Sequence, residues 1–245
     1  MKTRYIGTAL VTLGLSGMLG MPTTSLATET RFDFDMTIDG VDAIFLAGRT
    51  DVLPIPEPNG DPDAFILKRH GLLLPEFPLT EELPPAVPVV GGAEVRVVNR
   101  AIGGVSFFIG FSGPPIPITG PDGNAGSESI LLSLGGISGY KGPEGALVGV
   151  FLDDSIPDTD PAPDTLDFTP AGLGTSFASL SPALRQVFFI GDGFRSKNRH
   201  RFVAPPGATR LVLGIPDGFG FDGVPGAYED NNGGYMVRLG VAIPD

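Results

Sequence analysis

The chain has 245 residues, no cysteine, 28 acidic against 16 basic residues, and a formal net charge of -12. The lack of cysteine excludes a disulfide framework and thiol catalysis. The negative charge argues against binding to nucleic acid or to anionic membrane surfaces. Hydrophobic residues make up 42% of the chain and include 17 Phe, which is enough to form a sizeable core.

The N-terminus has the pattern of a secretory signal peptide. Lys2 and Arg4 precede an apolar stretch from 6 to 20, and Ser25-Leu26-Ala27 is a small-x-small cleavage site. The apolar stretch is too short to span a bilayer, and no later segment is long enough, so we expect no membrane insertion. We predict a signal peptide over 1–27, cleavage near Ala27, and a secreted or periplasmic protein with a net charge of about -14.

Many short apolar segments separated by Gly and Pro follow the leader. Residues 32–38 alternate Phe, Met and Ile with Asp and Thr, which is the period of a half-buried strand. Ser181 followed by Pro182 predicts the start of one short helix. This pattern predicts an all-β fold, an antiparallel β-sandwich or jelly roll with long Gly/Pro-rich loops. Further strands are predicted over 43–47, 64–67, 71–74, 94–97, 106–111, 146–152, 186–190, 200–204, 210–215 and 235–241.

We expect residues 28–245 to form a single domain, with extension strands over 28–88 and a core over 89–245. Two loops, 51–63 and 153–164, are rich in Asp and Pro. Such charge runs are typical of solvated loops, although either loop offers carboxylates for a second cation.

The C-terminal part of the chain predicts a calcium site. Asp217 follows shortly after the mainly apolar strand 210–215, and Asp222 lies in the Gly-rich loop beyond it. Asp230 and Asn231 precede the strand 235–241. If the two strands are neighbours, these oxygen-bearing side chains converge, and oxygen donors are what Ca²⁺ requires. The alternative is a simple turn, which Asp, Asn and Gly favour by themselves.

The same residues carry a family resemblance. The segments 201–205 and 211–217, with Val224-Pro225-Gly226-Ala227-Tyr228, Asp230-Asn231 and Gly233, resemble the C-terminal half of the calcium-dependent galactophilic bacterial lectins. The resemblance is good over about 200–241 and looser over 90–150. It implies a small antiparallel sandwich of galactose-binding-like type with one Ca²⁺ at its rim, whose coordination shell is completed by sugar hydroxyls.

Carried over to this chain, the resemblance makes Asp217, Asp230 and Asn231 side-chain ligands and Ala227 a carbonyl ligand. A further carbonyl would come from near Phe107 or Phe108. Tyr228, Asp122 and Asn232 become candidates for contact with the sugar.

The chain also departs from the lectin pattern. Five additional residues, 218–222, allow Asp222 to replace or join Asp217, and the loop 124–129 lacks the histidine with which these lectins contact sugar.

Local motifs for enzymatic catalysis are absent from the sequence. The only histidines are His70 and His200, and the basic neighbours of His200 are expected to disfavour its protonation. A glycosidase stays open as a less favoured reading, because its paired carboxylates meet in space and not in sequence. The basic segment 195–201 predicts a solvated hairpin tip, a partner for the acidic loops, or a contact for anionic polysaccharide.

We therefore expect a calcium-dependent carbohydrate-binding protein that is not an enzyme, with a glycan or cell-surface polysaccharide as its partner and oligomerisation left open. The alternative is an exported structural or adhesive protein whose Ca²⁺ only rigidifies the loop 217–231.

Overall fold

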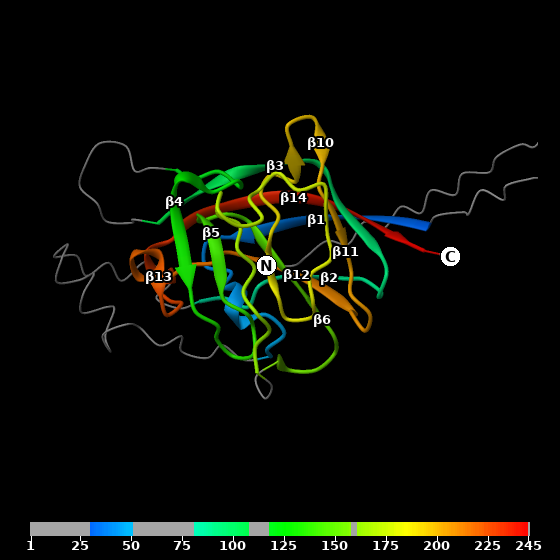
Figure 1. The fold of residues 1–245 in the computed structure, drawn as a ribbon, viewed down its shortest axis with the longest axis horizontal. Coiled ribbons are helices and arrows are strands. Elements are labelled where there is room, and N and C mark those ends of the chain that lie inside the picture. Colours follow the sequence, from blue (N-terminus) through cyan, green and yellow to red (C-terminus); the bar gives the residue numbers. More distant parts are fainter. Residues whose placement is uncertain (1–29, 51–80, 108–117, 158–160, 245) are drawn as a thin grey trace, which may run out of the picture.

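The computed structural model describes residues 30–50, 81–107, 118–157 and 161–244. These ranges form an all-β sandwich built from several mainly antiparallel sheets (Figure 1). The helices found in them are single 3-10 turns: η1 (Ile44–Leu46), η3 (Phe219–Phe221) and η4 (Tyr228–Asp230). None of the helices in the described ranges has the length and apolar character needed to cross a membrane. The predicted leader lies outside these ranges.

The largest sheet has five strands in the order β1-β14-β3-β11-β7. Its long members are β1 (Thr30–Asp39), β14 (Asn232–Ile243) and β3 (Glu94–Ser106), with the short strands β11 (Arg201–Val203) and β7 (Ser179–Leu180) at one edge. Only the β11-β7 pair is parallel. The alternation predicted over 32–38 is confirmed in β1, where Met36 and Ile38 are buried on either side of the exposed Thr37.

The facing sheet has four antiparallel strands in the order β2-β12-β6-β8. They are β2 (Ala86–Pro88), β12 (Arg210–Gly214), β6 (Val148–Leu152) and β8 (Val187–Phe189). All of β6 and nearly all of β12 are buried, which explains their continuous apolar sequences. Phe188 joins the sheets, since its ring lies 5.1 Å from that of Phe202 and 5.2 Å from that of Phe151. Burying each such side chain contributes roughly 1.5–3 kcal/mol.

A third sheet has the order β13-β4-β5, with β13 (Asp222–Gly223), β4 (Asn124–Leu131) and β5 (Tyr140–Glu144). The sequence suggested a loop over 124–129, and the structure has a strand there. Most β4 side chains are small, polar and exposed, so the strand carries no hydrophobic period and is held by backbone pairing to β5. A separate hairpin, β9 (Phe194–Arg195) with β10 (Asn198–Arg199), projects from the body (Figure 1) and accounts for the basic segment.

Two predicted elements take other forms. Residues 43–47 contain the turn η1, in which Leu46 N bonds to Ala43 O at 2.9 Å, and only Ala43 bridges to Ile215. The helix predicted at Ser181 is a turn, because Arg185 has a left-handed φ of 66° that a continuing helix excludes. The strands predicted over 64–67 and 71–74, most of 106–111 and the acidic loop 51–63 lie outside the described residues.

His200 is fully buried against the rings of Phe177, Phe189 and Phe202. Its Nδ1 lies 2.8 Å from Phe177 O, and its Nε2 is buried without a hydrogen-bond partner. Burial lowers the pKa of His200, and Arg195 lowers it further, while the bond to Phe177 and the charge of Asp192 act in the opposite direction. The direction agrees with the sequence expectation, but the main cause is burial and not the basic neighbours.

A pH-dependent loss of stability follows from this burial. Because the folded protein binds a proton at His200 less readily than the unfolded chain, His200 costs no stability above the unfolded pKa of about 6.5. As the pH falls below that value, stability should decrease by up to about 1.4 kcal/mol per pH unit until the folded pKa is reached. Urea denaturation of wild type and His200→Phe between pH 8 and pH 5 measures the effect, and the difference between the two should change with pH. An unchanging difference over that range would contradict it.

Candidate metal site at the end of strand β12

Strand β12 delivers Asp217 to the rim of the sandwich. Beyond the strand, Ile215 N donates to Asp42 O at 2.9 Å and Ile215 O accepts from Ile44 N at 3.2 Å, so the segment 42–44 fixes the exit of the chain. Asp217 itself is only 2% exposed. The loop therefore starts from a carboxylate that is buried and held in place.

Asn231 meets this carboxylate from the far side of the loop. Its Nδ2 donates to Asp217 Oδ2 at 2.8 Å and to Gly40 O at 2.9 Å. The other carboxylate oxygen, Asp217 Oδ1, accepts from Gly218 N at 2.7 Å. Thus the structure brings together the predicted residues Asp217 and Asn231, 14 positions apart in sequence.

The amide oxygen of Asn231 has an unusual environment. Asn231 is 6% exposed, and its Oδ1 is buried with no hydrogen-bond partner. Because Nδ2 already serves two acceptors, rotating the amide would place Oδ1 against those acceptors, so the observed orientation is the favourable one. A buried acceptor without a partner costs about 1–3 kcal/mol, and a cation would remove that cost.

Tyr228 supports the cluster from inside the fold. Its side chain is fully buried, and its hydroxyl donates to Ile215 O at 2.7 Å and accepts from Asp217 N at 3.1 Å. Burial, followed by the nearby charge of Asp217, raises the pKa of Tyr228 well above its usual value, so the hydroxyl stays protonated. In this position the ring offers no face to a sugar; it fixes the strand end and the loop relative to each other.

The returning loop has a strained turn at Ala227. Ala227 adopts the left-handed conformation with φ 63° and ψ 29°, which costs a residue with a Cβ roughly 1–2 kcal/mol. The preceding Gly226 donates its N–H to Asp217 O at 3.1 Å, and Asn231 N closes η4 on Tyr228 O at 3.1 Å. These bonds hold residues 226–231 against the end of β12.

The other candidates lie at the edge of this cluster or away from it. Asp230 is half-buried in η4, directly before Asn231, and Asn232 is exposed at the start of β14 opposite Ser106. Asp222 is exposed in β13 beside Ile130 of β4. Asp122 belongs to another cluster, where its Oδ1 accepts from Asp192 N at 2.7 Å.

Sequence reasoning missed the contribution of the Asp39–Asp42 turn. Gly40 lies directly against Asn231, since a Cβ there would be 3.3 Å from Asn231 Cβ and 3.2 Å from Val105 Cγ1. The nearby Asp42 is buried, and burial raises its pKa to about 7. The signal available in the sequence was the Asp-Gly pair that ends the first predicted strand, which is typical of a turn.

The donors fit a hard cation. Asp217, Asp230, Asn231 and nearby backbone carbonyls offer only oxygen, and Ca²⁺ takes six to eight oxygen ligands. Among the residues the structure describes, no three Asp, Glu or His side chains gather in a group that could hold a metal. A cation here would therefore depend on amide and carbonyl oxygens as well as on carboxylates.

Comparisons with family models, curated proteins and solved structures give no match to this chain. Its function must therefore be argued from the residues of the site.

Proposed function

We propose that this chain is an exported, calcium-dependent carbohydrate-binding protein whose site lies at the end of β12. The observation that supports the proposal most directly is the buried, unpartnered Oδ1 of Asn231, a residue whose amide nitrogen is bonded to the carboxylate of Asp217. An oxygen donor kept free of hydrogen bonds next to an anionic side chain is an arrangement that a divalent cation stabilises.

In this proposal four residues hold the ion. Asp217 and Asp230 supply carboxylates, Asn231 supplies its amide oxygen, and Ala227 supplies its carbonyl. Since Ca²⁺ takes more oxygens than these provide, the remaining positions are filled by water or by the hydroxyls of a sugar. Bound Ca²⁺ would neutralise the acidic residues at the rim and anchor a neutral glycan there.

One observation favours a second candidate function, in which Ca²⁺ only rigidifies the rim of an exported structural or adhesive protein. Asp217 and Asn231 are more than nine-tenths buried and link Gly40, Gly218 and the loop end through hydrogen bonds. A cation held that deeply would stabilise the fold even if no ligand reached it.

Calorimetric titration of the metal-free protein with CaCl₂, followed by a glycan array with and without EGTA, tests both functions. We expect a dissociation constant of roughly 10⁻⁴–10⁻³ M, in the range of extracellular modules, and glycan binding that EGTA abolishes. Calcium binding without any glycan signal would favour the structural function. A flat titration up to 10 mM CaCl₂ would overturn both.

A further inference from the structure

The outer side of the five-stranded sheet concentrates the basic residues of an acidic chain. Six arginines define what we call the arginine face; the hairpin β9-β10 extends it with Arg195 and Lys197, so that half of the chain's 16 basic residues gather here. Within the described ranges, four carboxylates form ion pairs with these arginines, which leaves eight basic and 24 acidic residues for the rest of the chain. The arginine face consists of Arg31, Arg96, Arg100, Arg199, Arg201 and Arg238.

The strand register brings Arg31 and Arg96 close together on this surface. In the ladders, Gly240 of β14 pairs with Arg96 of β3 on one side and with Asp33 of β1 on the other. Gly240 has no side chain, and the guanidinium of Arg31 lies over it, where any Cβ would collide with it. Arg31 and Arg96 thus occupy neighbouring rows of the sheet.

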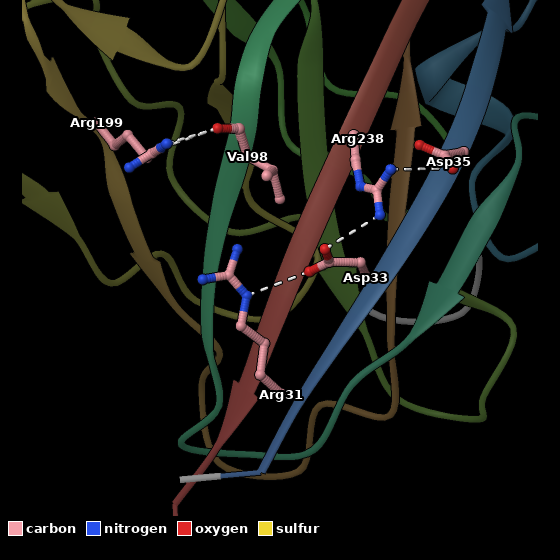
Figure 2. Close-up of polar contacts among 6 residues, drawn as sticks. All are labelled: Arg31, Asp33, Asp35, Val98, Arg199 and Arg238. Atoms are coloured by element: carbon pink, nitrogen blue, oxygen red, sulfur yellow. Dashed lines mark hydrogen bonds and ion pairs between the residues drawn. The ribbon is translucent and has the colours of Figure 1, made fainter. Parts of the chain in front are cut away.

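Carboxylates fix the arginines without covering them. Asp33 accepts from Arg31 Nε at 3.2 Å and from Arg238 Nη2 at 3.3 Å (Figure 2). The Asp33 side chain is 28% exposed, whereas those of Arg31 and Arg238 are 48% and 46% exposed. Because each guanidinium has five N–H donors, most of its donors remain available to solvent.

Glu94 plays the same part on the next row. Its carboxylate pairs with both Arg96 and Arg201, and its side chain is 21% exposed against 45% and 47% for the arginines. Here too the negative charge lies beneath and the positive groups lie outermost.

The hairpin arginines are also held in position. Arg199 reaches from β10 to Val98 O of β3 at 3.1 Å and 2.7 Å (Figure 2). Arg199 and Arg100 both lie over the ring of Phe194, at 5.4 Å and 4.8 Å from its centre. A ligand therefore meets side chains whose rotamers are already restricted, which lowers the entropy cost of binding.

We propose that the arginine face binds an anionic polysaccharide through carboxylate or sulfate groups. The planar guanidinium matches such groups in a bidentate way, and several arginines in rows match charges repeated along a chain. Excess negative charge elsewhere repels anions and directs them to this face. A single glycan chain can follow the rows, whereas a thick nucleic acid duplex would bring many more phosphates near the acidic remainder of the surface. The proposal does not depend on calcium.

Binding to immobilised polygalacturonate and dextran sulfate, with neutral dextran as reference and EGTA throughout, tests the proposal. We expect the full chain to bind both anionic polymers at 20 mM NaCl, not neutral dextran, and to lose affinity steeply as salt rises. The triple variant Arg31→Gln/Arg96→Gln/Arg201→Gln should bind about tenfold more weakly or worse, since it loses three exposed ionic contacts at once.

Two further variants separate binding from folding. Lys141→Gln removes one positive charge on β5, which belongs to the separate three-stranded sheet, and should bind like wild type. Asp35→Asn removes the most exposed acid of the face, at 63%, leaves every arginine in place, and should bind about two- to threefold more tightly. Three results would each overturn the proposal. They are unchanged binding by both the triple variant and Asp35→Asn, equal binding of the wild-type protein to neutral dextran, and stronger binding to duplex DNA.

Discussion

Replacing Asp217 with alanine is expected to abolish the rise in melting temperature that calcium produces in the wild-type protein. At 10 mM Ca²⁺ and a dissociation constant of roughly 10⁻⁴–10⁻³ M, linkage gives about 1.4–2.7 kcal/mol of stabilisation. For a chain of this size that corresponds to roughly 3–10 °C. The variant lacks the one carboxylate that is bonded to Asn231, so the ion loses its principal charge partner.

The measurement compares melting temperatures with EGTA and with 10 mM CaCl₂ within each variant. This comparison is needed because Asp217→Ala also leaves Gly218 N without its acceptor, which costs about 1–3 kcal/mol whether or not calcium is present. The matched control is Asn232→Ala, an exposed neighbour that should keep the full calcium response. A calcium-induced rise that survives in Asp217→Ala would remove this residue from the site.

Replacing Gly103 with alanine is expected to destabilise the fold by about 3–5 kcal/mol. Gly103 has a φ of +116°, which side-chain-bearing residues avoid, and a Cβ there would collide with Gly234 O of the neighbouring strand β14. Gly234 is part of the same ladder that starts at Asn232, so the strain would appear next to the candidate site. The backbone of β14 can approach β3 this closely only because residue 103 has no side chain.

Urea denaturation followed by circular dichroism measures this loss, because the chain has no Trp to report by fluorescence. Gly120→Ala is the matched control, since a Cβ at Gly120 would meet nothing within 4 Å. Its unfolding midpoint should stay close to that of wild type. Equal urea unfolding midpoints for Gly103→Ala and Gly120→Ala would show that the β3-β14 pairing tolerates a side chain at residue 103.

The sequence predicted those strands whose burial leaves a pattern. Residues 32–38 alternate because one face of β1 packs on the core, and 211–215 has no polar side chain because β12 is buried on both faces beyond Arg210. The strand β4 could not be found this way, since its side chains contribute little to the core. The run 43–47 is equally apolar but bends into η1, and burial alone does not distinguish a buried turn from a buried strand.

The candidate site was predictable in part for a similar reason. Asp217 and Asn231 flank one loop between two strands, so the sequence brings them near each other, and the structure joins them directly. Gly40 comes from a distant part of the chain, and its contact with Asn231 depends on the pairing of β1 with β14. Tyr228 was expected to face a ligand, but whether a tyrosine at a loop points outward or inward depends on packing that local sequence does not encode.

The place of β14 in the main sheet has a consequence for how the molecule assembles. Among the described residues this strand is the last in sequence, yet it lies between β1 and β3 and pairs with both over most of their length. Strand β1 can find this partner only after β14 has been synthesised, and contacts between such distant segments form slowly because a large loop must close first. Folding of the main sheet should therefore follow the synthesis of β14 and not accompany the synthesis of the earlier strands.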